Sequence, residues 1–205
     1  MFNGGDCFDS KARKSNIKIE IIDKLSKVYK SKTNPEDIFY YIYGILYSNK
    51  YRQKYNEFLK TDFPKIPFAK EFKVFEKVSK LGKELAELHL LKSVDLKKTD
   101  AKFPKDGDRK VKKRQYKDGK IYINDEQYFG ETSPEVWNYF IGGYQVLDKW
   151  LKDRIDRTLS AEDVNHYLKI ITALQNTIKL QKEIDEIYPE VEKKIINNLL
   201  ENFES

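Results

Sequence analysis

The chain has 205 residues, 40% of them hydrophobic and 14% aromatic, which excludes disordered, collagen-like and low-complexity proteins and allows a buried core. Its one cysteine, Cys7, excludes an internal disulfide, and with His89 and His166 it makes too small a ligand set for a zinc site. The longest apolar run, residues 38–47, is too short to span a bilayer, and no leader-peptide pattern is present. We therefore expect a soluble cytoplasmic protein with no resident metal and no membrane association.

One short segment carries the excess positive charge. The chain has 39 Lys and Arg against 33 Asp and Glu, which gives a net charge of +6. Residues 109–120 contain seven basic residues and a single acidic one, Asp118, so this segment accounts for the whole net charge. Its basic residues are Arg109, Lys110, Lys112, Lys113, Arg114, Lys117 and Lys120. A local patch of this kind says more about the partner than the overall isoelectric point does.

Helical patterns occupy the first half of the chain. Residues 1–15 show no period and are expected to be a loosely ordered lead-in. Apolar residues then recur at intervals of three and four, and Asn34-Pro35 supplies an N-cap followed by the residue type favoured at the first helical position. The helix after this cap is apolar on all sides, which predicts that it is buried. The helices expected in this half cover residues 16–29, 35–47, 51–59 and 70–92, with an extended crossing at Pro64 and Pro67.

A β pattern follows. Lys117-Asp118-Gly119 lies between β-prone runs that contain Tyr116 and Ile121, and an Asp-Gly pair in this position predicts a tight hairpin. Helical periodicity returns at residue 133, and one helix is expected over residues 134–151. Gly142-Gly143 falls inside that helix and should weaken it by roughly 1 kcal/mol per glycine.

The last helices are marked by a cap and a proline. Ser160 and Asp163 approximate a capping box, which predicts the start of the longest helix. Pro189 is expected to end it, and a final helix is expected to carry Val191 and Phe203. The patterns together predict an α+β fold that is predominantly α-helical, with a small basic antiparallel β-hairpin element inserted between helical parts. We expect one domain over residues 16–205, made of a helical part (16–95), the β element (108–130) and a second helical part (133–205).

The sequence contains no recognisable catalytic motif. It has no phosphate-binding loop, nucleophile elbow or dinucleotide fingerprint, so an independent small enzyme is the least favoured hypothesis. His89 and His166 are each expected to lie on a helix surface or to make a structural hydrogen bond. Asn34-Pro35 could start an adenine methyltransferase motif, but Glu36 and Asp37 do not fit a motif that stacks a flipped base. We therefore predict no catalytic residue in this chain.

The basic hairpin is the best candidate for nucleic-acid binding. Lysine side chains can neutralise phosphates, and we assign this role to Lys110, Lys112, Lys113, Lys117 and Lys120. Arg109, Arg114 and Gln115 are candidate readers of base edges. Lysines at strand edges also protect a sheet against unwanted pairing, but seven basic residues in twelve exceed that need.

A second basic group follows the 134–151 segment. Lys152, Arg154 and Arg157 are included as candidate DNA contacts, with Lys149 nearby. Asp148, Asp153 and Asp156 alternate with these cations, so an ion-paired surface explains the group equally well. The tyrosines at positions 40, 41, 43 and 47 are better explained as core residues with polar tips than as base-stacking residues.

Several segments resemble the C-terminal target recognition domain of Type ISP restriction–modification enzymes, which are large single polypeptides. The resemblance extends over roughly residues 35–187, in the same order and spacing. Its most specific segments are Pro134-Glu135-Val136-Trp137, Ile141-Gly142-Gly143-Tyr144-Gln145-Val146, Lys149-Trp150-Leu151-Lys152-Asp153-Arg154 and Arg157-Thr158-Leu159-Ser160. Where the family usually has Lys-Gly before Arg157, this chain has Ile155-Asp156, which removes one positive charge and a flexible turn.

The resemblance implies sequence-specific binding of double-stranded DNA. In this family the domain positions DNA for an adenine-N6 methyltransferase and a nuclease that are carried elsewhere in the polypeptide. It also implies that S-adenosylmethionine, ATP and Mg²⁺ belong to those other domains and that this chain needs no cofactor. Neither the residues nor the resemblance identifies the bases that are read.

A helical docking module is the alternative hypothesis. Such a module would bind the methyltransferase or translocase domains of the same enzyme and would not bind DNA on its own. Its contact surface would be an exposed apolar stripe such as Leu81, Leu85 and Leu88. We expect the chain by itself to be a monomer.

Overall fold

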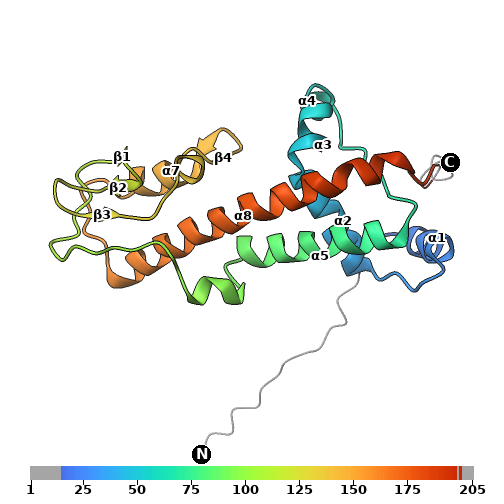
Figure 1. Ribbon diagram of the computed structural model, residues 1–205, viewed down its shortest axis with the longest axis horizontal. Helices are drawn as coiled ribbons and strands as arrows, with labels where there is room; N and C mark the ends of the chain where they lie inside the picture. The colour runs from blue at the N-terminus through green and yellow to red at the C-terminus, as the bar shows by residue number, and fades with distance from the viewer. Residues whose placement is uncertain (1–14, 198, 200–205) are drawn as a thin grey trace, which may run out of the picture.

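The computed structural model describes residues 15–197 and residue 199, and one long helix crosses the whole molecule (Figure 1). This helix, α8 (Ala161–Lys193), packs against the other helices along its C-terminal half and against the core under a small three-stranded sheet along its N-terminal half. The predicted fold class, mostly helical with small antiparallel sheets between helices, is confirmed. The lead-in, apart from its last residue, and Phe203 lie outside the described residues.

The first helical part forms largely as the periodicity predicts. It contains α1 (Ile19–Tyr29), α2 (Pro35–Tyr47), α3 (Asn49–Lys54), α4 (Phe58–Thr61), α5 (Phe72–His89) and the short 3₁₀ helix η1 (Val94–Lys97). The Asn34 side chain accepts from the Asp37 amide and caps α2, as predicted. The helix expected over 51–59 is instead two short helices, α3 and α4. Phe39 leaves about half of its surface exposed, so the prediction that α2 is buried on all sides was wrong.

Helices α2 and α5 touch backbone to backbone at two glycines. A Cβ atom added to Gly82 would lie 1.9 Å from the carbonyl oxygen of Tyr40 and 2.9 Å from the amide nitrogen of Gly44. A Cβ at Gly44 would lie 3.0 Å from the carbonyl oxygen of Val78. Because these neighbours are backbone atoms that cannot rotate away, only glycine permits this helix separation.

Helix α5 lies within the predicted residues 70–92, and the first hairpin also forms where the sequence predicted it. Strands β1 (Gln115–Lys117) and β2 (Lys120–Tyr122) pair in antiparallel register, and β3 (Tyr128–Phe129) adds to β2. Asp118 and Gly119 both have positive φ values, 47° and 75°, which is the conformation of a two-residue hairpin turn. The Asp-Gly signal therefore placed this hairpin correctly.

The helix predicted over residues 134–151 was wrong. The segment forms a short helix α6 (Pro134–Trp137), a second hairpin of β4 (Phe140–Ile141) and β5 (Tyr144–Gln145), and helix α7 (Val146–Lys152). Gly142 and Gly143 adopt φ values of 55° and 85°, so they make a two-residue turn instead of weakening a helix. Apolar residues three and four apart on either side of this turn produced the misleading helical period.

Helix α8 starts at its predicted capping box and continues past its predicted end. Ser160 and Asp163 exchange the side-chain to backbone hydrogen bonds of a capping box. Pro189 lies within the helix, which runs on to Lys193, because a proline there removes one hydrogen bond near the end while Tyr188 and Val191 remain buried. The last helix expected after it does not begin in the described residues, since Ile195 instead pairs with Ala69 in an isolated antiparallel bridge.

His89 makes structural hydrogen bonds that join three helices. This is one of the two alternatives that the sequence predicted for it. Its Nδ1 lies 2.7 Å from Tyr43 Oη on α2, and its Nε2 lies 3.0 Å from Thr177 Oγ1 on α8. Burial lowers the pKa of His89, because the charged imidazolium is poorly solvated there. His166 lies on the exposed surface near the ring of Trp150. None of the helices in the described part of the chain is long and apolar enough to cross a membrane.

Replacing Gly82 by alanine tests the close helix contact. We expect Gly82→Ala to lower the free energy of unfolding by about 1–3 kcal/mol, because overpacking outweighs the better helix propensity of alanine. Gly130→Ala is the matched control, since a Cβ there meets nothing closer than a Tyr128 ring carbon at 3.5 Å. Urea unfolding measures both variants, and equal losses in the two would contradict the proposed contact.

Histidine protonation tests the junction of α2, α5 and α8. The folded-state pKa of His89 lies below the unfolded value, so the stability that depends on neutral His89 is fully present above about pH 6.5. That stability is lost as the pH falls below this value toward the folded-state pKa. We expect His89→Gln to reduce the loss of unfolding free energy between pH 7.5 and 5.5, measured by urea titration. Equal losses in wild type and variant would show that His89 does not titrate as the structure requires.

Candidate nucleic-acid interface

The three-stranded sheet has one buried face and one outer face. Tyr116 and Ile121 are cross-strand partners, and Ile121 is fully buried beside Phe129 of β3. Because side chains alternate along a strand, their neighbours lie on the opposite face. The residues of this outer face are Gln115, Lys117, Lys120, Tyr122 and Tyr128.

Lysines lie over the tyrosine rings of this outer face. Lys120 Nζ is 4.7 Å from the centre of the Tyr128 ring, and Lys113 Nζ is 5.5 Å from that of Tyr122. The two rings are themselves 5.3 Å apart. Cations beside exposed aromatic rings can bind phosphates and also contact sugars or bases. Neither tyrosine was predicted from the sequence. For Tyr122 the spacing of two residues from Lys120 in β2 was a usable signal, but β3 contains no lysine, so Tyr128 gave none.

The structure brings the two basic groups of the sequence together. Lys110 and Thr158 form an isolated antiparallel bridge, and the Val111 amide donates to the Arg157 carbonyl at 3.0 Å. The Leu159 amide in turn donates to the Arg109 carbonyl at 3.0 Å. Segments 109–111 and 157–159 are therefore neighbours, so that Arg157 extends the basic surface that starts at Arg109.

Several of the predicted DNA contacts are engaged within the protein. Arg114 Nη1 donates to both carboxylate oxygens of Asp148, and the two side chains are about one-quarter exposed. Arg154 pairs with Asp163 at 3.5 Å, and its guanidinium lies 3.6 Å from the centre of the Trp150 ring.

Lys113 and Lys149 are also paired. Lys113 donates to Asp125 at 2.8 Å and lowers the pKa of that carboxyl, and Lys149 lowers the pKa of Asp153 in the same way. In the ranges that the structure describes, the remaining predicted contacts make no ion pair. These are Arg109, Lys110, Lys112, Gln115, Lys117, Lys120, Lys152 and Arg157.

Asp156 explains how the chain keeps a turn without the family's usual glycine. Its φ is 63°, in the left-handed region that glycine adopts without strain and that Asp tolerates better than most residues. Its amide donates to the Val111 carbonyl at 2.8 Å. Asp156 therefore adopts here the backbone conformation that a glycine would adopt without strain, and adds a negative charge.

The apolar stripe of the docking hypothesis is buried inside the protein. Leu81, Leu85 and Leu88 pack with residues of α8, including Leu180 and Ile184. The prediction that this stripe is exposed was therefore wrong, because the partner helix is supplied by the chain itself. Among the described residues, no group of three acidic, histidine or cysteine side chains is placed to hold a metal ion.

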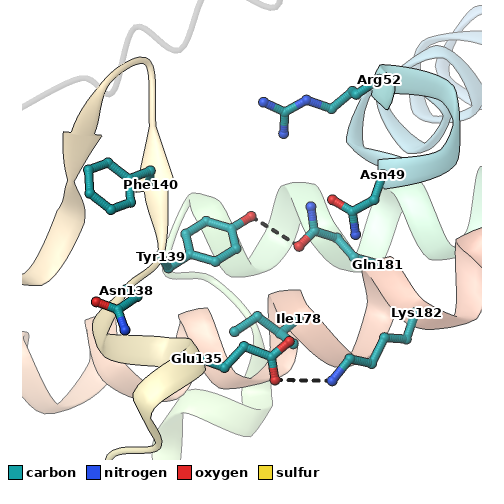
Figure 2. Close-up of a pocket in the computed structure, with 9 residues that line it drawn as sticks. All are labelled: Asn49, Arg52, Glu135, Asn138, Tyr139, Phe140, Ile178, Gln181 and Lys182. Carbon is teal, nitrogen blue, oxygen red and sulfur yellow. Dashed lines mark hydrogen bonds and ion pairs between the residues drawn. The ribbon is translucent and has the colours of Figure 1, made fainter. Parts of the chain in front are cut away.

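A pocket of about 260 Å³ lies between α3 and β4, with α8 as its floor (Figure 2). Tyr139 Oη donates to Gln181 Oε1 at 3.2 Å, and burial raises the pKa of Tyr139 to about 12. Arg52 extends from α3 into this space, and its guanidinium makes no ion pair with any residue that the structure describes. Its positive charge acts on Tyr139 and favours a lower pKa there, against the larger effect of burial. Phe140 lines the opposite side. Among its described lining residues, the pocket therefore offers the Arg52 guanidinium and the exposed ring of Phe140.

The fold is shared with parts of three solved DNA complexes. A nuclease-deletion mutant of the Type ISP restriction–modification enzyme LlaGI, in complex with a DNA substrate mimic, is 23% identical over 75% of this chain and 14% of that chain, with a TM-score of 0.57. The ATP-dependent Type ISP restriction–modification enzyme LlaBIII, bound to DNA, is 25% identical over 89% of this chain and 13% of that chain, with a TM-score of 0.63. A DrdV–DNA complex is 20% identical over 85% of this chain and 20% of that chain, with a TM-score of 0.63.

The matched part is between 13% and 20% of the length of those chains, so this chain spans only a small part of each. The profile of the Type ISP C-terminal specificity domain matches residues 3–183. The chain belongs to this family, which confirms the resemblance seen in the sequence. Among curated proteins, none is significantly similar to this chain.

Proposed function

We propose that this chain is the DNA target recognition module of a restriction–modification enzyme and binds double-stranded DNA in a sequence-specific way. The observation that carries the proposal is the outer face of the β1–β2–β3 sheet, where lysines lie over tyrosine rings, in a member of the specificity-domain family. Its support from relatives is that LlaGI and LlaBIII were solved with DNA.

The proposal gives a role to each predicted contact that makes no ion pair, except Lys152. Lys110, Lys112, Lys117 and Lys120 neutralise phosphates and so set the position of the module on the duplex. Arg109, Gln115 and Arg157 have unpaired polar groups with which to read base edges. Arg114 can serve as a reader only by leaving Asp148, so we assign it first to holding β1 against α7.

The proposal places catalysis outside this chain. The adenine-N6 methyltransferase, the translocase and the nuclease would be carried by other domains of the same enzyme, together with S-adenosylmethionine, ATP and Mg²⁺. This chain would bind those domains as well as DNA, and would supply the sequence information for both methylation and cleavage.

The salt dependence of DNA binding tests the phosphate contacts. For each phosphate contacted, log affinity should fall with log salt with a slope of roughly −0.9. We expect Lys112→Gln combined with Lys117→Gln to make the slope shallower by about 2, because two phosphate contacts are lost. Fluorescence anisotropy with a labelled duplex between 50 and 300 mM salt measures it.

The matched control removes the same charge elsewhere. Lys73→Gln combined with Lys77→Gln changes two exposed lysines of α5, on the other helical part of the molecule. This control should keep the wild-type slope. An unchanged slope in the first variant, or an equal change in the control, would contradict the assignment.

A further inference from the structure

The β4–β5 hairpin carries an exposed apolar tip that neither the core nor the basic face uses. Phe140, Ile141 and Tyr144 are 56%, 46% and 63% exposed, and they make up three of the four strand residues. Isolated exposed apolar side chains are common on protein surfaces, but this short ribbon carries them on both faces. Ile141 and Tyr144 are cross-strand partners on one face, and Phe140 lies on the other.

The turn of this hairpin is thin and free of neighbours. A Cβ added at Gly142 or Gly143 would meet nothing within 4 Å, and both residues have positive φ. The ribbon therefore ends in bare backbone, with Ile141 paired directly opposite Tyr144 just behind it. Figure 1 shows the hairpin projecting from the side of α8 toward which α3 and α4 also project.

The base of the hairpin is held rigidly. Tyr139, the residue before β4, donates through its hydroxyl to Gln181 of α8, and its carbonyl accepts from the Val146 amide at 3.1 Å (Figure 2). Gln145 Nε2 donates to the Trp137 carbonyl at 2.6 Å. An exposed tip on a fixed base can be inserted into a partner with little loss of conformational entropy.

The base of the hairpin also packs against the sheet that carries the proposed DNA-binding face. The Trp137 ring stacks on Tyr116, on the inner face of β1, at 5.6 Å and nearly parallel. Asp148, three residues after β5, holds Arg114 next to the same strand. Arg52 shares a pocket with Phe140, so a positive charge faces the ribbon across that space. A polyanion bound to the sheet would therefore lie close to the hairpin.

We infer that the β4–β5 hairpin enters a groove of the bound duplex and packs its apolar side chains against the bases. This inference rests on the proposed function and adds a contact to it. A two-stranded ribbon fits the major groove of B-form DNA, which is about 12 Å wide. Apolar side chains at a protein tip are the type that wedges between base steps, and aromatic rings stack on any base. Arg52 neutralises a phosphate on the strand that faces α3.

The test compares DNA affinity and its salt slope in the full 205-residue chain. Phe140→Thr combined with Tyr144→Thr removes both rings and keeps strand-forming residues, so the hairpin is retained. We expect about ten- to a hundredfold weaker binding to duplex DNA with the wild-type salt slope, because stacking is lost and phosphate contacts are not. Phe63→Thr is the matched control, because Phe63 is 87% exposed on a different segment, and it should bind as wild type does.

Each other outcome contradicts the inference in a distinguishable way. If wild type and the double variant bind equally tightly, the hairpin does not contact DNA, and the proposed function stands. If their DNA affinity is equal and the wild type alone dimerises in sedimentation, the tip is covered by a second copy. If the wild type does not bind a randomised duplex pool at 50 mM salt, both the proposed function and the hairpin contact are wrong.

Discussion

The packing of α8 against every part of the core is the constraint on which the rest of the structure depends. Its 33 residues span about 50 Å, and its buried face changes partner along the way. Tyr167 and Ile171 pack in the core under the sheets, Leu180 and Ile184 pack against α5, and Val191 packs with α1 and α2. No other element takes part in all three hydrophobic clusters of the described residues. Helix α8 therefore fixes the distance between the three-stranded sheet and the helices α1, α2 and α5.

Two polar residues of α8 place the elements that project from it. Gln181 is buried and links Tyr139, at the base of β4, to the carbonyl of Tyr47 at the end of α2. One helical turn further on, Asp185 accepts from Ser48 Oγ at 2.7 Å and from the Lys50 amide at 3.1 Å, at the N-terminal end of α3. Both the hairpin and α3 are thus oriented by the same stretch of helix. This arrangement fixes the positions of both projections relative to α8, as the proposed DNA-binding function would require.

The sequence predicted the elements whose signals are local. The Asn34 cap, the periodicity of α5 and the Asp118-Gly119 turn depend only on neighbouring residues, and each was confirmed. The failures were cases in which the rest of the fold decides. Gly142-Gly143 could be a weak point in a helix or a turn, and Pro189 stays helical because buried neighbours on both sides hold it. The Leu81–Leu88 stripe was read as exposed because the sequence does not show that α8 covers it.

The candidate DNA-binding face could be predicted only in part for the same reason. Its charge was visible in residues 109–120, but ion pairing to Asp148 and Asp125 depends on how distant segments meet.

The most direct test of the account is a selection of randomised duplex DNA by this chain at two salt concentrations, with the retained pool sequenced. The account predicts salt-sensitive binding and enrichment of one short asymmetric motif, with both reduced by Lys112→Gln and Lys117→Gln together. Absence of retained DNA at low salt, or retention without any enriched motif, would contradict it.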